Sequence, residues 1–110
     1  MATTAVSWNK GERRRAKLEA ELGRILTRLP QLGVVKAIVF GSMASGRVGS
    51  TSDLDLILVA PSSEPFVRRL ERFYRTLEPS VGLDLFVYTP EEFARMAETN
   101  SFVQIGRAHV

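Results

Sequence analysis

Residues 34–59 read VVKAIVFGSMASGRVGSTSDLDLILV, and this stretch decides the fold. It begins with β-branched and aromatic residues, Val34 to Phe40, which predict a strand. Glycine and serine dominate residues 41–52, which predicts a loop with at most one helical turn. The apolar run from Asp53 to Val59 predicts a second strand. The stretch therefore predicts two strands joined by a glycine- and serine-rich connection.

The sequence on both sides of this stretch predicts alternating helices and strands. Apolar residues recur at helical spacing in residues 10–29 and in residues 64–77, so we expect a helix in each range. Residues 81–88 predict a third strand, and Thr89-Pro90 followed by two glutamates predicts the start of a last helix. We therefore expect a single α+β domain, a small mixed β-sheet with flanking helices, in the order α-β-loop-β-α-β-α.

The chain has three aspartates, and all three fall in predicted strands, where aspartate is uncommon. Asp53 and Asp55 are two residues apart, so they point to the same face of their strand. The run Leu54–Val59 resembles Leu83–Tyr88, and the helix between the two runs supplies the crossover that parallel strands need. We therefore expect Asp84 beside Asp55. Three unpaired carboxylates repel each other, and Mg²⁺ would relieve that repulsion. The alternative is three strand-end residues that face solvent.

The pair Gly41-Ser42 comes directly after the first predicted strand. Glycine lets backbone N–H groups approach a phosphate closely, and serine adds a hydroxyl donor. A plain turn is the alternative. The sequence contains neither the Gly-Lys-Ser/Thr of a P-loop nor a GxGxxG motif that opens a helix, so neither of those nucleotide sites is supported.

Together, these residues resemble the motif of the polymerase-β-type nucleotidyltransferase superfamily. The resemblance is closest to its minimal nucleotidyltransferase (MNT) branch. It rests on Gly41-Ser42, Gly46, Asp53-Leu54-Asp55 and Asp84, and it covers about residues 34–89. The chain departs from the family pattern at Ala44-Ser45-Gly46, where family members often carry Ala-Arg-Gly.

The resemblance implies an enzyme, a Mg²⁺-dependent nucleotidyltransferase that moves a nucleoside monophosphate, AMP from ATP, to an acceptor hydroxyl. It implies that Asp53, Asp55 and Asp84 are the catalytic residues and hold two Mg²⁺ ions. It also implies that Gly41 and Ser42 hold the outer phosphates of ATP or another NTP.

Proteins of this branch often pair with a small helical HEPN toxin and adenylylate it as its antitoxin, so the resemblance implies such a partner. Two alternatives remain open. One is a non-catalytic antitoxin that acts by binding alone. The other is an aminoglycoside-type nucleotidyltransferase that modifies a small molecule.

Charge and composition add further limits. The net charge is +3, and the first predicted helix carries several cations, including Arg13-Arg14-Arg15 and Lys17. They form either a solvated face or a docking surface for an acidic partner or an RNA, and we do not expect nucleic acid as a direct partner. The chain has no cysteine, which excludes disulfides and thiolate metal sites. It has no apolar run of ~20 residues and no signal-peptide pattern. We therefore expect a cytoplasmic protein that does not bind membranes.

The last residues, Ile105 to Val110, match the translation of a common sequencing adapter. We therefore expect the nucleotidyltransferase domain to comprise residues 1–103, and residues 104–110 to be a non-native tail of a truncated reading frame. His109, the single histidine, receives no functional role. An ordinary helical C-terminus is the alternative.

Overall fold

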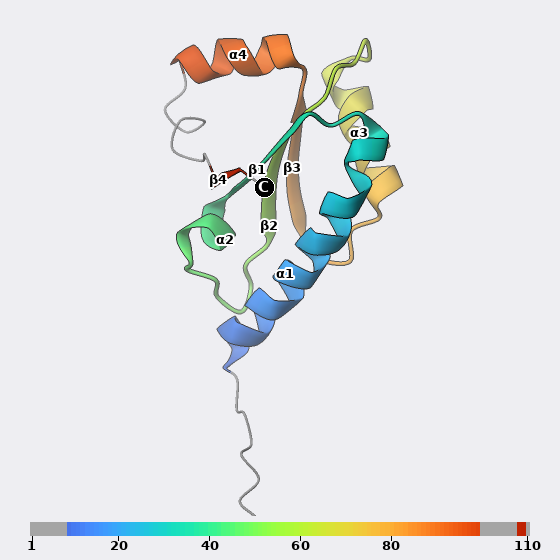
Figure 1. Cartoon of the computed structure of the whole chain (residues 1–110). Helices are drawn as coiled ribbons and strands as arrows, with labels where there is room; N and C mark the ends of the chain where they lie inside the picture. The colour runs from blue at the N-terminus through green and yellow to red at the C-terminus, as the bar shows by residue number, and fades with distance from the viewer. Residues whose placement is uncertain (1–8, 100–107, 110) are drawn as a thin grey trace, which may run out of the picture.

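The computed structural model describes residues 9–99 and 108–109 (Figure 1). Within these ranges the strands are β1 Lys36–Phe40, β2 Leu54–Val59, β3 Leu83–Tyr88 and β4 Ala108–His109. The α-helices are α1 Lys10–Arg28, α2 Gly41–Ser45, α3 Phe66–Leu77 and α4 Pro90–Thr99, and a short 3₁₀ helix spans Pro30–Leu32.

The sheet is mixed, and its strands lie in the order β3-β2-β1-β4. Strands β2 and β3 are parallel and are connected through α3, whereas β1 runs antiparallel to both β2 and β4. Because β1 is antiparallel to β2, the end of β1 lies beside the beginning of β2. The connection between β1 and β2 therefore lies at the end of the sheet where β2 and β3 both begin. The predicted α+β class, mixed sheet and flanking helices are confirmed.

The hydrophobic core lies between the sheet and the pair α1 and α3, which are on the same side of it (Figure 1). Strands β1, β2 and β3 contribute alternate residues to this core, including Leu54, Leu56 and Leu58 from β2 and Leu85 and Val87 from β3. Since neighbouring residues of a strand point to opposite faces, Asp55 and Asp84 belong to the other face. Helix α4 lies on that face, where the Lys36 ammonium is 5.3 Å from the centre of the Phe93 ring.

Side-chain caps fix the beginning of two helices. The Asn9 side chain accepts a hydrogen bond of 2.7 Å from the backbone N–H of Glu12 and so caps α1. The backbone N–H of Glu92 donates to the Thr89 hydroxyl at 3.2 Å, and the backbone N–H of Thr89 donates to the Glu92 carboxylate at 2.8 Å. This reciprocal pair is a capping box. The predicted threonine cap of the last helix is confirmed.

The C-terminal end differs from the sequence prediction in one respect, because it supplies a strand that the predicted element order lacks. Ala108 and His109 pair with Val39 and Ile38 of β1. The predicted boundary at residue 103 lies outside the described residues, so the division into residues 1–103 and 104–110 stays a prediction. Within residues 9–99 and 108–109, the helices lack the combination of length and apolar character that crossing a membrane requires.

Candidate active site

Asp55 and Asp84 lie opposite each other on the parallel strands β2 and β3. Their carboxyl groups share a hydrogen bond, and the pKa of Asp55 is raised to about 6. Partial burial is the largest cause, followed by the hydrogen bond with Asp84, the charge of Asp84 and the charge of Asp53. Two acids held together in this way are typical of functional sites, because burial and like charge both disfavour the ionised form.

Gly41 lies directly against the Asp55 carboxylate. It is the first residue of α2, its φ angle is +69°, and a Cβ atom at this position would overlap the Asp55 carboxylate. Glycine is therefore required here twice, for the left-handed backbone and for the close approach. Ser42 follows it in α2 and is partly buried. The register of the sheet explains this contact, since Phe40 at the end of β1 pairs with Asp55.

Asp53 lies just before β2, and its carboxylate lies beside Arg14 of α1. Its Oδ1 atom is 3.5 Å from Nη2 of Arg14, and half of its side chain is exposed. Its carboxylate also covers Gly82, where a Cβ atom would overlap it. The structure thus brings two of the three predicted carboxylates into contact and places the third beside them. In the part of the chain that the structure describes, no three His, Cys, Asp or Glu side chains are arranged to hold a metal ion.

The chemistry of these donors fits a hard divalent cation. Carboxylate oxygens are the ligands that Mg²⁺ prefers in proteins. The closeness of Asp84 helps to raise the pKa of Asp55 and also favours the binding of a cation. A positive charge between the two carboxylates would offset their mutual repulsion. Asp53, two residues from Asp55 and half exposed, is the third available donor.

Arg14 also belongs to this region, although its place in a run of cations predicted no particular role for it. Its Nε donates a hydrogen bond of 2.7 Å to the backbone carbonyl of Ser52, and its Nη2 lies beside Asp53. The guanidinium therefore connects α1 to the segment that leads into β2. Its position in a run of cations was visible in the sequence, but its contact with the aspartate segment depends on how α1 packs.

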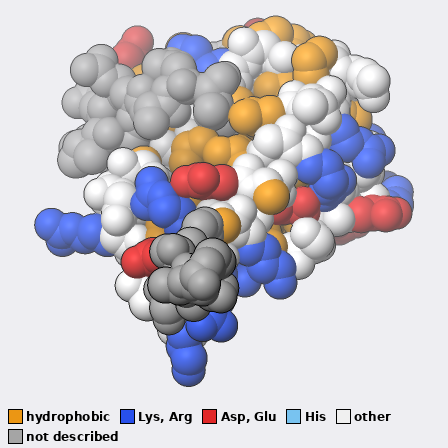
Figure 2. All heavy atoms as spheres, turned by 60° about the horizontal axis from the view of Figure 1, so that its bottom comes forward, with side chains coloured by type: hydrophobic (Ala, Val, Ile, Leu, Met, Phe, Trp, Pro, Cys, Tyr) orange, Lys and Arg blue, Asp and Glu red, His pale blue; other side chains and the backbone are white. Residues whose placement is uncertain are grey.

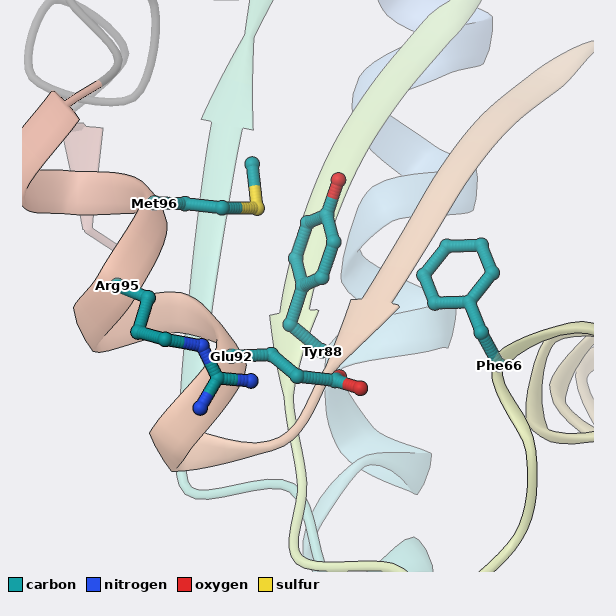
Figure 3. A pocket seen from close by; sticks show the side chains of 5 residues that line it. All are labelled: Phe66, Tyr88, Glu92, Arg95 and Met96. Atoms are coloured by element: carbon teal, nitrogen blue, oxygen red, sulfur yellow. The ribbon is translucent and has the colours of Figure 1, made fainter.

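A separate hollow of about 370 Å³ was not predicted and lies at the opposite end of β3 from Asp84. It is lined by Phe66, Tyr88, Glu92, Arg95 and Met96. Figure 3 shows Tyr88 in the middle, with Arg95 and Met96 of α4 on one side of it and Phe66 on the other. Tyr88 is the last residue of β3, four positions beyond Asp84, so this hollow does not include the carboxylate pair.

Aspartates at matching positions of adjacent parallel strands, next to a glycine-serine pair that begins a short helix, define a domain of the nucleotidyltransferase class. Residues 22–106 match the family described as nucleotidyltransferase domain. Because this match covers most of the chain, the chain belongs to that family, whose general activity is nucleotidyl transfer.

One solved structure supports the fold assignment. The chain resembles the crystal structure of a putative nucleotidyltransferase from Sulfolobus solfataricus, with a TM-score of 0.64. The two proteins are 16% identical in sequence, and the match covers 96% of this chain and 88% of that one. At this identity the likeness shows a shared fold. No curated protein sequence matches the chain significantly.

Proposed function

We propose that this protein transfers AMP from ATP to an acceptor hydroxyl in a Mg²⁺-dependent reaction. The observation that carries the proposal is the contact between the carboxyl groups of Asp55 and Asp84, with Gly41 against Asp55. A site of this kind suits in-line displacement at phosphorus, which needs charge stabilisation on both the attacking and the leaving oxygen.

Each residue of the site has a role in this proposal. Asp55 and Asp84, together with Asp53, would hold Mg²⁺, which supplies positive charge to the reacting oxygens when it is bound. Asp84 is exposed and accepts the proton of the acceptor hydroxyl. The acceptor oxygen then bonds to the α-phosphorus, the bond from this phosphorus to the β-phosphate oxygen breaks, and pyrophosphate leaves. Gly41 lets the start of α2 lie directly against the Asp55 carboxylate, and the Ser42 hydroxyl would donate a hydrogen bond to a phosphate of the nucleotide.

We further propose that the acceptor hydroxyl belongs to a small helical protein of the HEPN type, which the reaction inactivates. The support is the resemblance of the Gly41-Ser42 and Asp53-Leu54-Asp55 motifs to the MNT branch. The exposure of Asp53 and Asp84 is compatible with this role, because a hydroxyl carried by a folded protein can reach only an open site.

Labelled ATP tests both parts of the proposal. The protein is incubated with Mg²⁺ and the helical partner, using ATP labelled on either the α- or the γ-phosphate. We expect the partner to acquire the α label and not the γ label, and we expect EDTA to abolish the transfer. Transfer of the γ label would mean phosphorylation and would contradict the proposal. An Asp55→Asn variant that still neutralises the partner would show that binding alone is sufficient.

A further inference from the structure

The two paired aspartates lie on strands with different surroundings. Asp55 is on β2, which pairs with β1 on one side and with β3 on the other. Asp84 is on β3, which is the last strand on its side of the sheet in the part of the chain that the structure describes. The Gly82 carbonyl accepts a hydrogen bond of 2.9 Å from the Leu54 N–H, so even-numbered residues of β3 direct their backbone groups towards β2. Odd-numbered residues therefore direct theirs towards the outer edge.

Side chains of α3 satisfy backbone groups along this outer edge. The Tyr74 hydroxyl donates a hydrogen bond of 2.6 Å to the Leu83 carbonyl and accepts one of 3.1 Å from the Leu85 N–H. Further along the strand, Nη1 of Arg69 donates a hydrogen bond of 2.7 Å to the Val87 carbonyl. Helix α3 thus supplies partners that a further strand would otherwise supply, which is one way in which proteins protect an edge strand.

The two hydrogen bonds of Tyr74 lie on either side of Asp84. The Leu83 carbonyl belongs to the peptide group that precedes Asp84, and the Leu85 N–H belongs to the peptide group that follows it. Because peptide groups are planar, the orientations of these two groups set the φ and ψ angles of Asp84. These angles in turn set the direction of its Cβ atom. One hydroxyl group therefore restrains the direction in which the Asp84 side chain leaves the strand.

Asp84 depends on such a restraint because its own side chain is exposed. Figure 2 brings forward the lower end of Figure 1, where β2 begins, and shows acidic side chains at this surface among basic and apolar ones. Packing therefore does little to fix Asp84, whose carboxyl shares a hydrogen bond with that of Asp55. The ring of Tyr74, in contrast, packs against the hydrophobic core. Tyr74 thus connects the backbone around Asp84 to the core.

We infer that Tyr74 is a positioning residue, which holds the Asp84 carboxyl beside that of Asp55 through the backbone on either side of Asp84. The inference rests on the proposed function for the reaction that Asp84 serves. Tyr74 acts through Asp84 and not on the reacting atoms, since its ring packs on the core side of the sheet. Residues that orient metal ligands in this way commonly affect metal affinity and activity without touching the metal.

Two variants of α3 test this inference. Tyr74→Phe keeps the ring and removes both hydrogen bonds to β3. The matched control is Thr76→Val, which also removes a hydroxyl group from a half-buried position of α3. The Thr76 hydroxyl donates its hydrogen bond of 2.8 Å to the Arg72 carbonyl, within the helix. Circular dichroism melts establish that both variants fold, and a general loss of helix stability should affect both alike.

Amide hydrogen exchange, followed by NMR, measures the restraint directly. In Tyr74→Phe we expect the Leu85 amide to exchange at least about tenfold faster than in the parent, because it loses its acceptor. The Phe86 amide faces β2 and should keep its protection, and Thr76→Val should match the parent at both amides. Unchanged exchange at Leu85, or equal acceleration in both variants, would overturn the inference. Equal acceleration at Leu85 and Phe86 would show that the whole strand opens, and it would also overturn the inference.

Metal binding and turnover then distinguish a positioning role from a structural one. Electron paramagnetic resonance gives the affinity for Mn²⁺, and transfer of the α label from ATP to the helical partner at saturating Mg²⁺ gives kcat and KM. We expect Tyr74→Phe to bind Mn²⁺ about tenfold more weakly and to have a kcat about tenfold lower, with KM for ATP within about twofold of the parent. Thr76→Val should match the parent in all three. If Leu85 exchanges faster in Tyr74→Phe while Mn²⁺ affinity and kcat are unchanged, Tyr74 only stabilises β3 and the inference is wrong.

These measurements separate the inference from the proposed function. If the parent transfers AMP and Tyr74→Phe equals it in Mn²⁺ affinity and kcat, the inference fails and the proposed function stands. If the parent transfers no AMP, the proposed function fails. Exchange at Leu85 and affinity for Mn²⁺ do not depend on transfer, so they still decide whether Tyr74 positions Asp84.

Discussion

The replacement Asp55→Asn should make the protein without metal more stable. It removes one charge from the Asp55–Asp84 pair and nearly preserves the shape of the side chain. The pKa of Asp55 is raised from its ordinary value of 3.8 to about 6, which corresponds to about 3 kcal/mol against the ionised form. Since the side chain is only partly buried, solvent screens this cost, and we expect the free energy of unfolding to rise by about 1–2 kcal/mol at pH 7.

The dependence on pH distinguishes this cause from a general effect of the substitution. Below pH 3.8 Asp55 is protonated in both the folded and the unfolded protein, so its raised pKa costs nothing there. The cost grows as the pH rises from 3.8 and is complete above about pH 6. The gain in stability of Asp55→Asn over the parent should therefore be greatest above about pH 7 and should shrink towards about pH 4.

Urea unfolding near pH 4 and pH 7.5 measures this difference. Asp53→Asn is the matched control, because it removes the same charge from a side chain that is half exposed. We expect the control to change the free energy of unfolding by at most about 0.5 kcal/mol. The reasoning is refuted if Asp55→Asn is less stable than the parent at pH 7.5, or if its gain is the same at both pH values.

Three further predictions concern Glu21, Gly41 and the stabilisation by Mg²⁺ with ATP. The buried Glu21 accepts hydrogen bonds from Arg24 and from the Ser80 N–H, and Arg24 is the main reason that its pKa is lowered to about 2. In urea unfolding, Glu21→Gln should lower the free energy of unfolding by about 2 kcal/mol at pH 7. The parent should lose this stabilisation as the pH falls from about 4.5 to about 2, and the variant, which lacks it, should not show this loss. Gly41→Ala should abolish most AMP transfer in the labelled-ATP assay, because the added methyl group would displace the Asp55 carboxylate. Gly33→Ala is the control, since Gly33 has a similar φ of +78° but open space around it. This control should lower the melting temperature and keep the transfer activity. In thermal melts, Mg²⁺ with ATP at a hundredfold excess over Kd should stabilise the parent by about 2.7 kcal/mol and Asp55→Asn much less, and equal shifts would contradict the assignment of Asp55.

Much of the fold could be predicted because local signals and tertiary structure agree. The apolar runs that end at Val59 and Tyr88 both became strands, and their similarity correctly predicted a parallel pair. The short helix α2 and the two-residue strand β4 were harder to predict. The first is only one helical turn in a glycine- and serine-rich stretch, and the second depends on an edge of β1 that no local pattern reveals.

The burial of two charged side chains in the helices could not be predicted from periodicity. Glu21 and Arg69 are charged, yet they lie on the apolar stripes of α1 and α3 and are buried. Arg69 is tolerated there because it donates to the Val87 carbonyl and the Glu92 carboxylate, each at 2.7 Å. Val87 and Glu92 are distant from Arg69 in sequence, so a helical pattern alone gives no sign of how this guanidinium is satisfied. The pair of Glu21 with Arg24 has helical spacing, but the hydrogen bond that Glu21 accepts from the Ser80 N–H is again distant in sequence.

The site was predictable as far as strand alternation and register determine it. The contact between Asp55 and Asp84 follows from two parallel strands with an acid at the same position of each. The orientation of Asp53 towards Arg14 does not follow, because it depends on where the first turns of α1 pack against the segment before β2.

Transfer of the α label from ATP by single-residue variants tests the central claim, that the Asp55–Asp84 pair catalyses nucleotidyl transfer. The parent is compared with Asp84→Asn, Asp55→Asn and Glu71→Gln, and the last removes an exposed acid of α3 as a control. We predict that each aspartate variant folds and loses at least about a hundredfold in rate, while Glu71→Gln keeps the rate of the parent. Transfer at the parental rate by a folded Asp84→Asn or Asp55→Asn variant would contradict the claim.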